Sequence, residues 1–173
     1  MSLAQSFLAE FEKEAVTTRK FLERVPENQL SWRPHEKSMT AGQLALHMAS
    51  IPGNVLRLAM QDTPTPPDFG RTPPQPTSVK EILEALDGSI AFVRENLPTI
   101  TDERLAEIWR LNKNGKEILA IPRAAVLRNI LLNHWYHHRG QFGVYLRLLG
   151  ANVPSAYGPS GDELPDFLKP AAA

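Results

Sequence analysis

The sequence predicts an all-α protein, a four-helix bundle in a single domain over residues 1–173. Four stretches carry apolar residues at helical spacing, and clusters of proline, glycine and polar residues separate them. A globule of this length buries roughly 70% of its unfolded surface, so it can hold a core without disulfides. Cysteine is absent, so a transition-metal site would have to be built from imidazole, carboxylate and water.

The first two predicted helices span residues 2–25 and 40–60. Apolar residues share one face of the first helix, which ends before Pro26. The second helix begins at Thr40, and Gln43 stands three residues later, at the spacing of a capping box.

A long connection at residues 61–77 follows the second helix. It contains six prolines, which exclude a helix or a central strand. This connection is longer than antiparallel neighbours in a bundle need, and long crossovers join helices that run parallel. The helix directions are therefore predicted as up-down-down-up, with the third helix at residues 78–97. Its Ser78 and Glu81 again have capping-box spacing.

The part of the chain after the third helix is less regular. Asn114-Gly115 stands between two apolar runs, which is a hairpin signal. We therefore expect a small hairpin or loop before the fourth helix, which is predicted for residues 122–150. A tail rich in proline, glycine and serine follows at residues 151–173.

The charge balance excludes several classes of partner. Lysine and arginine together number 19, as do aspartate and glutamate. Proteins that bind nucleic acids or anionic membranes usually carry an excess of positive charge. This chain has none, so neither is expected as a partner. No stretch of apolar residues is long enough to span a membrane, and the first residues lack the pattern of a secretion signal. We therefore expect an intracellular, cytoplasmic protein.

Three of the five histidines, His134, His137 and His138, lie in the fourth predicted helix. At about 100° per residue, His134 and His138 are about 40° apart and one turn from each other, close enough to bind one metal ion. On the same scale the apolar arc of this helix is centred about 20° from His134, and His137 lies about 60° away on the other side. The inward-facing pair is therefore His134 and His138.

Two neighbouring imidazoles inside a bundle are hard to satisfy by hydrogen bonds alone, because each leaves a ring nitrogen without a partner. A metal ion would satisfy both, and a third ligand could come from His47 on the inner face of the second helix. Pro52, just over one turn later, removes a backbone donor and predicts a kink near this point. The sequence spacing of the histidines does not distinguish this metal site from a metal-free bundle in which the histidines only form hydrogen bonds, and both interpretations are equally open.

Other polar residues are candidates for supporting roles. Gln141 and Asn54 face the same side as the histidines and could orient a bound water or substrate, or simply bond to a neighbouring helix. Arg139, about 140° round the helix, is predicted to point outward. The inner helix faces carry no carboxylate that could act as a general base, although Asp162 and Glu163 in the tail could fold over the site.

Several motifs carry a family resemblance. In chain order they are Trp32-Arg-Pro, Ser38-Met-Thr, Leu44-Ala-Leu-His47, His134-Trp-Tyr-His-His138-Arg-Gly-Gln141 and Tyr145-Leu-Arg-Leu-Leu-Gly150. Together they resemble the DinB-like (DNA-damage-inducible, YfiT-related) superfamily, over about Leu3 to Pro165. The motif in the fourth helix is fairly specific, whereas the other matches are of pattern.

The resemblance implies an up-down-down-up bundle that often forms homodimers and holds a divalent metal ion, nickel or zinc, on three histidines. On this chain the ligands fall on His47, His134 and His138, the residues that the helical geometry favours. Several relatives are thiol-dependent transferases or isomerases whose small-molecule substrate is a low-molecular-weight thiol. The predicted function is therefore a metal-dependent enzyme of thiol S-transferase or isomerase type. A metal-dependent hydrolase and a non-catalytic metal-binding or sensing protein are the alternatives.

Overall fold

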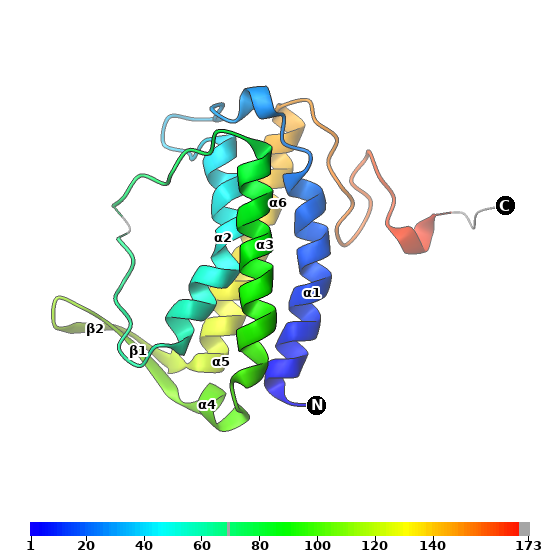
Figure 1. Ribbon diagram of the computed structural model, residues 1–173. Coiled ribbons are helices and arrows are strands. Elements are labelled where there is room, and N and C mark those ends of the chain that lie inside the picture. Colours follow the sequence, from blue (N-terminus) through cyan, green and yellow to red (C-terminus); the bar gives the residue numbers. More distant parts are fainter. Residues whose placement is uncertain (69, 170–173) are drawn as a thin grey trace.

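Helices make up most of the molecule. The structure, a computed structural model, describes residues 1–68 and 70–169. Three long helices, α1 (Leu3–Leu22), α2 (Ala41–Met60) and α3 (Val79–Asn96), lie side by side with a helical column at residues 123–148, which ends in α6 (His134–Leu148) (Figure 1). α2 and α3 run downward in this view, whereas α1 and the column run upward. Among the described residues, no helix is both long and apolar enough to cross a membrane.

Two of the long helices begin at the expected capping residues. Thr40 Oγ1 accepts a hydrogen bond from the backbone N–H of Gln43 (3.1 Å), and Gln43 Oε1 accepts one from the backbone N–H of Thr40 (3.0 Å). These bonds complete the predicted capping box of α2. At α3, Ser78 Oγ accepts a bond from the Glu81 amide (3.2 Å), but the Glu81 carboxylate bonds to the Thr77 amide instead of closing a box.

The proline-rich stretch at residues 61–77 is an extended connection, as predicted, and its described residues form no helix or strand. It leads from the lower end of α2 back to the upper end of α3, so these two helices run parallel (Figure 1). Side chains hold its far end to the bundle. Gln43 Nε2 donates to the Pro73 carbonyl (2.9 Å), and Gln75 Nε2 donates to the Leu30 carbonyl (3.2 Å).

A two-stranded antiparallel sheet, β1 (Ile108–Lys113) and β2 (Lys116–Pro122), projects from the lower end of the molecule, after the short helix α4 (Asp102–Ala106) (Figure 1). Asn114 and Gly115 join the strands with positive φ angles of 52° and 74°, as a type I′ turn requires. The suggested hairpin is therefore present. Because it is a true sheet, the prediction of an all-α fold is wrong in this segment.

The fourth predicted helix is not uniform. β2 runs through Pro122, and the column consists of α5 (Arg123–Val126), a π-helical segment (Leu127–Asn133) and α6 (His134–Leu148). A π-helix bonds residue i to residue i+5, so angles counted at about 100° per residue drift across it. The prediction of one continuous α-helix is thus wrong just before His134, where no proline or glycine signals the change.

The buried face of α6 also differs from the predicted one. Its buried residues are Trp135, His138, Arg139, Phe142, Tyr145 and Leu146. Counted from His134, they centre at about 80° rather than 20°. Arg139, which was predicted to point outward, is only 2% exposed, and Leu148 is 59% exposed. His134 and His138 therefore lie at one edge of the buried face.

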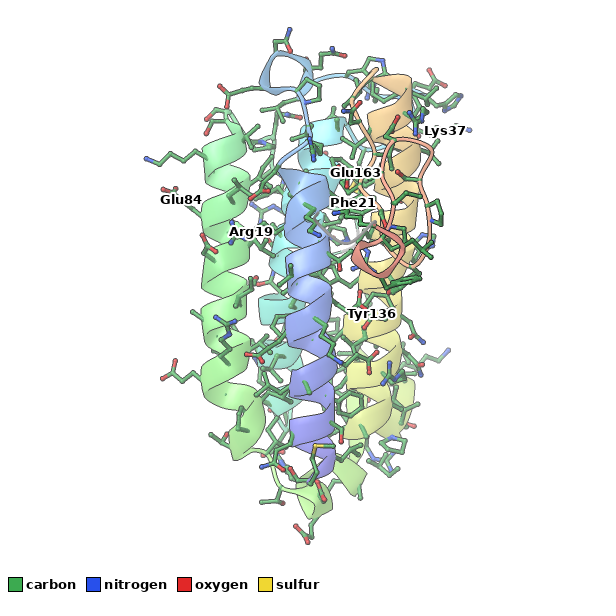
Figure 2. The ribbon with its side chains drawn as sticks, turned by 90° about the vertical axis from the view of Figure 1, so that its right-hand side faces the viewer. Arg19, Phe21, Lys37, Glu84, Tyr136 and Glu163 are labelled. Carbon is green, nitrogen blue, oxygen red and sulfur yellow. The ribbon has the colours of Figure 1, made fainter. Side chains whose placement is uncertain are left out.

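Arg139 can be buried because polar groups surround its guanidinium. It forms an ion pair with Glu14 of α1 (2.5 Å) and donates hydrogen bonds to Thr18 Oγ1 (3.2 Å) and the Tyr157 hydroxyl (2.5 Å). The Tyr157 hydroxyl in turn donates to Glu14 (2.9 Å). The tail lies over α6 and beside α1, close to Tyr136 (Figure 2). The ion pair and the hydrogen bonds of Tyr157 together join α6, α1 and the tail.

The C-terminal end of α2 is held by side chains from the hairpin and the column. Carbonyls in the last turn of a helix have no helical donor. Trp109 Nε1 donates to the Leu58 carbonyl (3.3 Å), and Arg123 donates to the carbonyls of Ala59 and Gln61. These bonds fix the lower end of α2 against the rest of the fold.

Candidate metal centre

Three histidines from two helices meet beside the core. His47 lies on α2, and His134 and His138 lie one turn apart at the start of α6. One ligand atom from each lies within 4.8 Å of the others. The ring centroids are 5.4 Å apart for His47 and His134, 4.8 Å for His47 and His138, and 4.5 Å for His134 and His138. The structure thus brings together the three residues proposed as ligands.

The ring of His138 has a defined orientation. Its Nδ1 lies 2.9 Å from Gln141 Oε1. Because an amide oxygen accepts hydrogen bonds, Nδ1 carries the proton in this arrangement and Nε2 has a lone pair. That Nε2 atom lies 2.8 Å from Nε2 of His134. The free lone pair of His138 is therefore directed at a second imidazole.

His134 cannot satisfy both of its nitrogens in this setting. If its Nε2 donates a proton to His138, its Nδ1 must accept one, yet Nδ1 is buried and has no hydrogen-bonding partner among the described residues. The other tautomer sets two lone pairs against each other at 2.8 Å. A cation bound to both atoms removes this conflict. Two nitrogens on one tetrahedral zinc ion are about 3.3–3.4 Å apart, roughly half an ångström more than the observed separation, so a small side-chain movement lets the residues fit a divalent ion.

The cluster lies at the rim of the core. His47 and His134 are half-buried, and His138 is 9% exposed. The adjacent His137 is exposed, with its ring centroid 5.0 Å from that of His138. Three protein ligands at a partly exposed site correspond to an open metal centre, in which further positions accept water or substrate, rather than to a closed structural one.

Comparison with protein families assigns the chain to a known group. The model described as the DinB family matches residues 1–165 of the chain. The chain belongs to the DinB family. Over 162 residues it is 31% identical to YrdA from Bacillus subtilis strain 168, which covers 93% of this chain and 92% of that protein. The family resemblance carried by the motifs is thus confirmed.

Solved DinB-like proteins have similar folds. One from Bacillus cereus ATCC 10987 matches with a TM-score of 0.69 and 28% identity, covering 88% of this chain and 97% of that chain. Another, YjoA from Bacillus subtilis, matches with a TM-score of 0.67 and 20% identity, covering 88% of this chain and 96% of that chain. At this lower identity the second comparison shows the fold alone.

Burial keeps the imidazoles of this DinB-family site neutral. Desolvation, and then the charges of His138 and His134, lower the pKa of His47 to about 4. Desolvation also lowers the pKa of His138, against the opposing effect of Gln141. It lowers the pKa of His134 too; the Ile130 carbonyl opposes this shift, although it forms no hydrogen bond of normal geometry with Nδ1. Neutral imidazole is the form that binds metal ions.

We predict that the metal-free protein loses stability as the pH falls from about 6.5 to about 4. The unfolded chain protonates His47 near its ordinary pKa of 6.5, whereas the folded chain protonates it only near 4. The unfolded state therefore binds more protons in this window, and acid favours it. Urea unfolding at several pH values measures the effect. His47→Gln is the matched control and should lose less stability over this window; an equal loss would contradict the prediction.

The two amides proposed for supporting roles differ in their placement. Gln141 bonds to His138 and so lies directly behind a candidate ligand. Asn54 is exposed, and no hydrogen bond joins it to the cluster in the described part of the chain. A supporting role for Asn54 therefore stays a prediction.

The tail carboxylates are engaged elsewhere. Asp162 pairs with Arg147 (2.7 Å), and Glu163 pairs with Arg24 (2.8 Å). Figure 2 shows Glu163 at the α1 side of the molecule. The suggested folding of these residues over the site is not seen, and within the described residues the cluster consists of imidazoles alone.

Trp135 is a neighbour of the site that helical spacing did not identify. Its indole donates a hydrogen bond to the carbonyl of Met48, the residue after His47 (2.8 Å). A signal for it existed in the sequence. Pro52 deprives the Met48 carbonyl of its helical donor, so a buried partner had to come from another element.

Proposed function

We propose that this DinB-family protein is a metal-dependent enzyme that transfers or isomerises groups on a low-molecular-weight thiol. The observation that carries the proposal is the cluster of three neutral imidazoles at a partly exposed rim, in which the Nε2 atoms of His134 and His138 face each other at 2.8 Å. His47, His134 and His138 would hold a divalent ion, nickel or zinc. Such an ion would lower the pKa of a thiol or water that binds beside the histidines.

The absence of a carboxylate from the described cluster favours a thiol over water as the nucleophile. A thiol has a pKa of about 8.5 and water one of about 15.7, so a thiol needs far less assistance to ionise near neutral pH. Hydrolysis would further need a general base to take up the proton of water. The protein supplies orientation instead, because Gln141 holds the ring of His138.

The directions of the helices also support a finer description of the fold. The directions of α1, α2, α3 and the column support placing the chain among the up-down-down-up four-helix bundles, with the hairpin as an addition (Figure 1). Homodimer formation stays a prediction. Sedimentation of the untagged protein would measure it.

Assays of the untagged protein with small thiols and alkylating or epoxide electrophiles test the proposal. Protein loaded with nickel or zinc should consume thiol and electrophile together and form a thioether. Chelator should stop the reaction, and added metal should restore it. Metal-dependent cleavage of esters or amides without thiol would support the hydrolase instead. Stoichiometric metal binding without turnover of either kind of substrate would support a metal-binding or sensing protein.

A further inference from the structure

α2 continues through Pro52 without a break, although proline has no backbone N–H. The carbonyl four residues earlier, that of Met48, therefore has no helical donor. Trp135 on α6 supplies one: its Nε1 donates to the Met48 carbonyl at 2.8 Å. Met48 and Trp135 are both fully buried, so bulk water cannot replace the indole.

This hydrogen bond joins residues that stand next to the metal ligands. Met48 follows His47 on α2, and Trp135 follows His134 on α6. We propose that the bond between Trp135 and Met48 is a positioning contact that sets the spacing between His47 and the histidine pair on α6. The inference rests on the proposed metal site and adds residues that act through its ligands.

His47 depends on such a contact more than its partners do. In the described residues no hydrogen bond holds its ring, whereas Gln141 holds the ring of His138. The His47 ring lies 4.8 Å from His138 and 5.4 Å from His134, measured between centroids. How far His47 lies from the pair is thus set by how closely α2 and α6 approach each other.

Trp135 is suited to fix this approach because its own position is constrained. Its indole stacks on Phe11 of α1, with centroids 5.3 Å apart and an angle of 22° between the ring planes. A stacked ring in a close-packed interior cannot change rotamer without opening the core. The indole N–H therefore points in one fixed direction. The Met48 carbonyl must lie in that direction to accept its hydrogen bond.

The same bond also satisfies a buried carbonyl, which by itself would be a purely structural role. Replacing Pro52 separates the two roles, because alanine supplies the backbone N–H that the Met48 carbonyl lacks. In a Trp135→Phe/Pro52→Ala double variant the carbonyl has a helical donor again. The indole hydrogen bond that tied α2 to α6 at this point is then gone, and only packing remains.

Cobalt(II) binding and urea unfolding of the untagged full chain test the proposal. We expect Trp135→Phe to lower the unfolding midpoint and to weaken cobalt binding about tenfold or more, as changes behind a metal ligand commonly do. The double variant should recover the midpoint but keep the weaker binding and show an altered visible cobalt spectrum. Pro52→Ala alone should bind like wild type, because it keeps the indole bond.

Trp109→Phe is the matched control. It removes the other described indole that donates to an α2 carbonyl, at Leu58, which is remote from the histidines along the helix. We expect a lower unfolding midpoint and unchanged cobalt affinity. If Trp109→Phe weakens binding as much as Trp135→Phe, the affinity loss reflects general destabilisation and the proposal is overturned.

Two further results would also overturn it: wild-type cobalt affinity in Trp135→Phe, or recovery of affinity in the double variant. If the wild-type protein binds no metal, the proposed function fails instead. The spacing is then tested by crystal structures of the metal-free wild type and double variant. The centroid distance between His47 and His138, now 4.8 Å, should increase, and an unchanged distance would rule out the positioning role.

Discussion

Replacing His138 with alanine is expected to weaken nickel and zinc binding by more than about 100-fold, because residues behind a ligand alone commonly account for 10–100-fold. His138 is the central member of the cluster. Its Nε2 faces that of His134 at 2.8 Å, and its ring lies 4.8 Å from that of His47. Calorimetric titration and elemental analysis of the untagged variant measure the loss, and circular dichroism checks the fold.

The neighbouring His137 provides the matched control. It is the same residue type on the same helix, but it is exposed and stands outside the group of three. His137→Ala should bind within a few-fold of wild type, whereas His134→Ala should resemble His138→Ala. Equal losses from His137→Ala and His138→Ala would show that the ligand set has been assigned wrongly.

The one-turn spacing of the histidine pair could be predicted from local geometry, although its selection over His137 relied on the apolar arc of the whole helix. His134 and His138 are one turn apart, and α6 begins at His134, so the π-helical segment before it does not alter their relation. The hairpin was equally local, because two residues with positive φ at Asn114-Gly115 define its turn. The capping box of Thr40 depended on three neighbouring residues. Each of these features is determined within a few residues of sequence.

The rotation of α6 was not local and was predicted wrongly. The sequence argument took Arg139 for a surface residue because it lies about 140° round the helix from His134, away from the predicted apolar arc. Its counterion, Glu14, lies at the other end of the chain, and Tyr157 completes the set from the tail. The apolar arc was also counted across a segment that proved to be π-helical. Only the tertiary partners show that Arg139 faces inward.

Loss of the charge on Glu14 is expected to be the most destabilising single change considered. Glu14→Gln keeps the size of the side chain but leaves the Arg139 guanidinium, with a 2% exposed side chain, without its counterion. Removing one partner of a buried ion pair costs about 3–5 kcal/mol, and we expect about 3 kcal/mol here because Thr18 and Tyr157 still accept hydrogen bonds. The free energy of urea unfolding measures the loss.

Glu12 offers a control two residues earlier on the same helix. It pairs with Arg94 at 3.0 Å, but both side chains are substantially exposed, at 44% and 59%. Solvent screens such pairs, so Glu12→Gln should cost less than about 1 kcal/mol. If the two variants lose similar free energy, the charge of Arg139 is compensated by other groups. A Glu14→Leu/Arg139→Met double variant should be more stable than Glu14→Gln, because it removes the unpaired charge together with its partner.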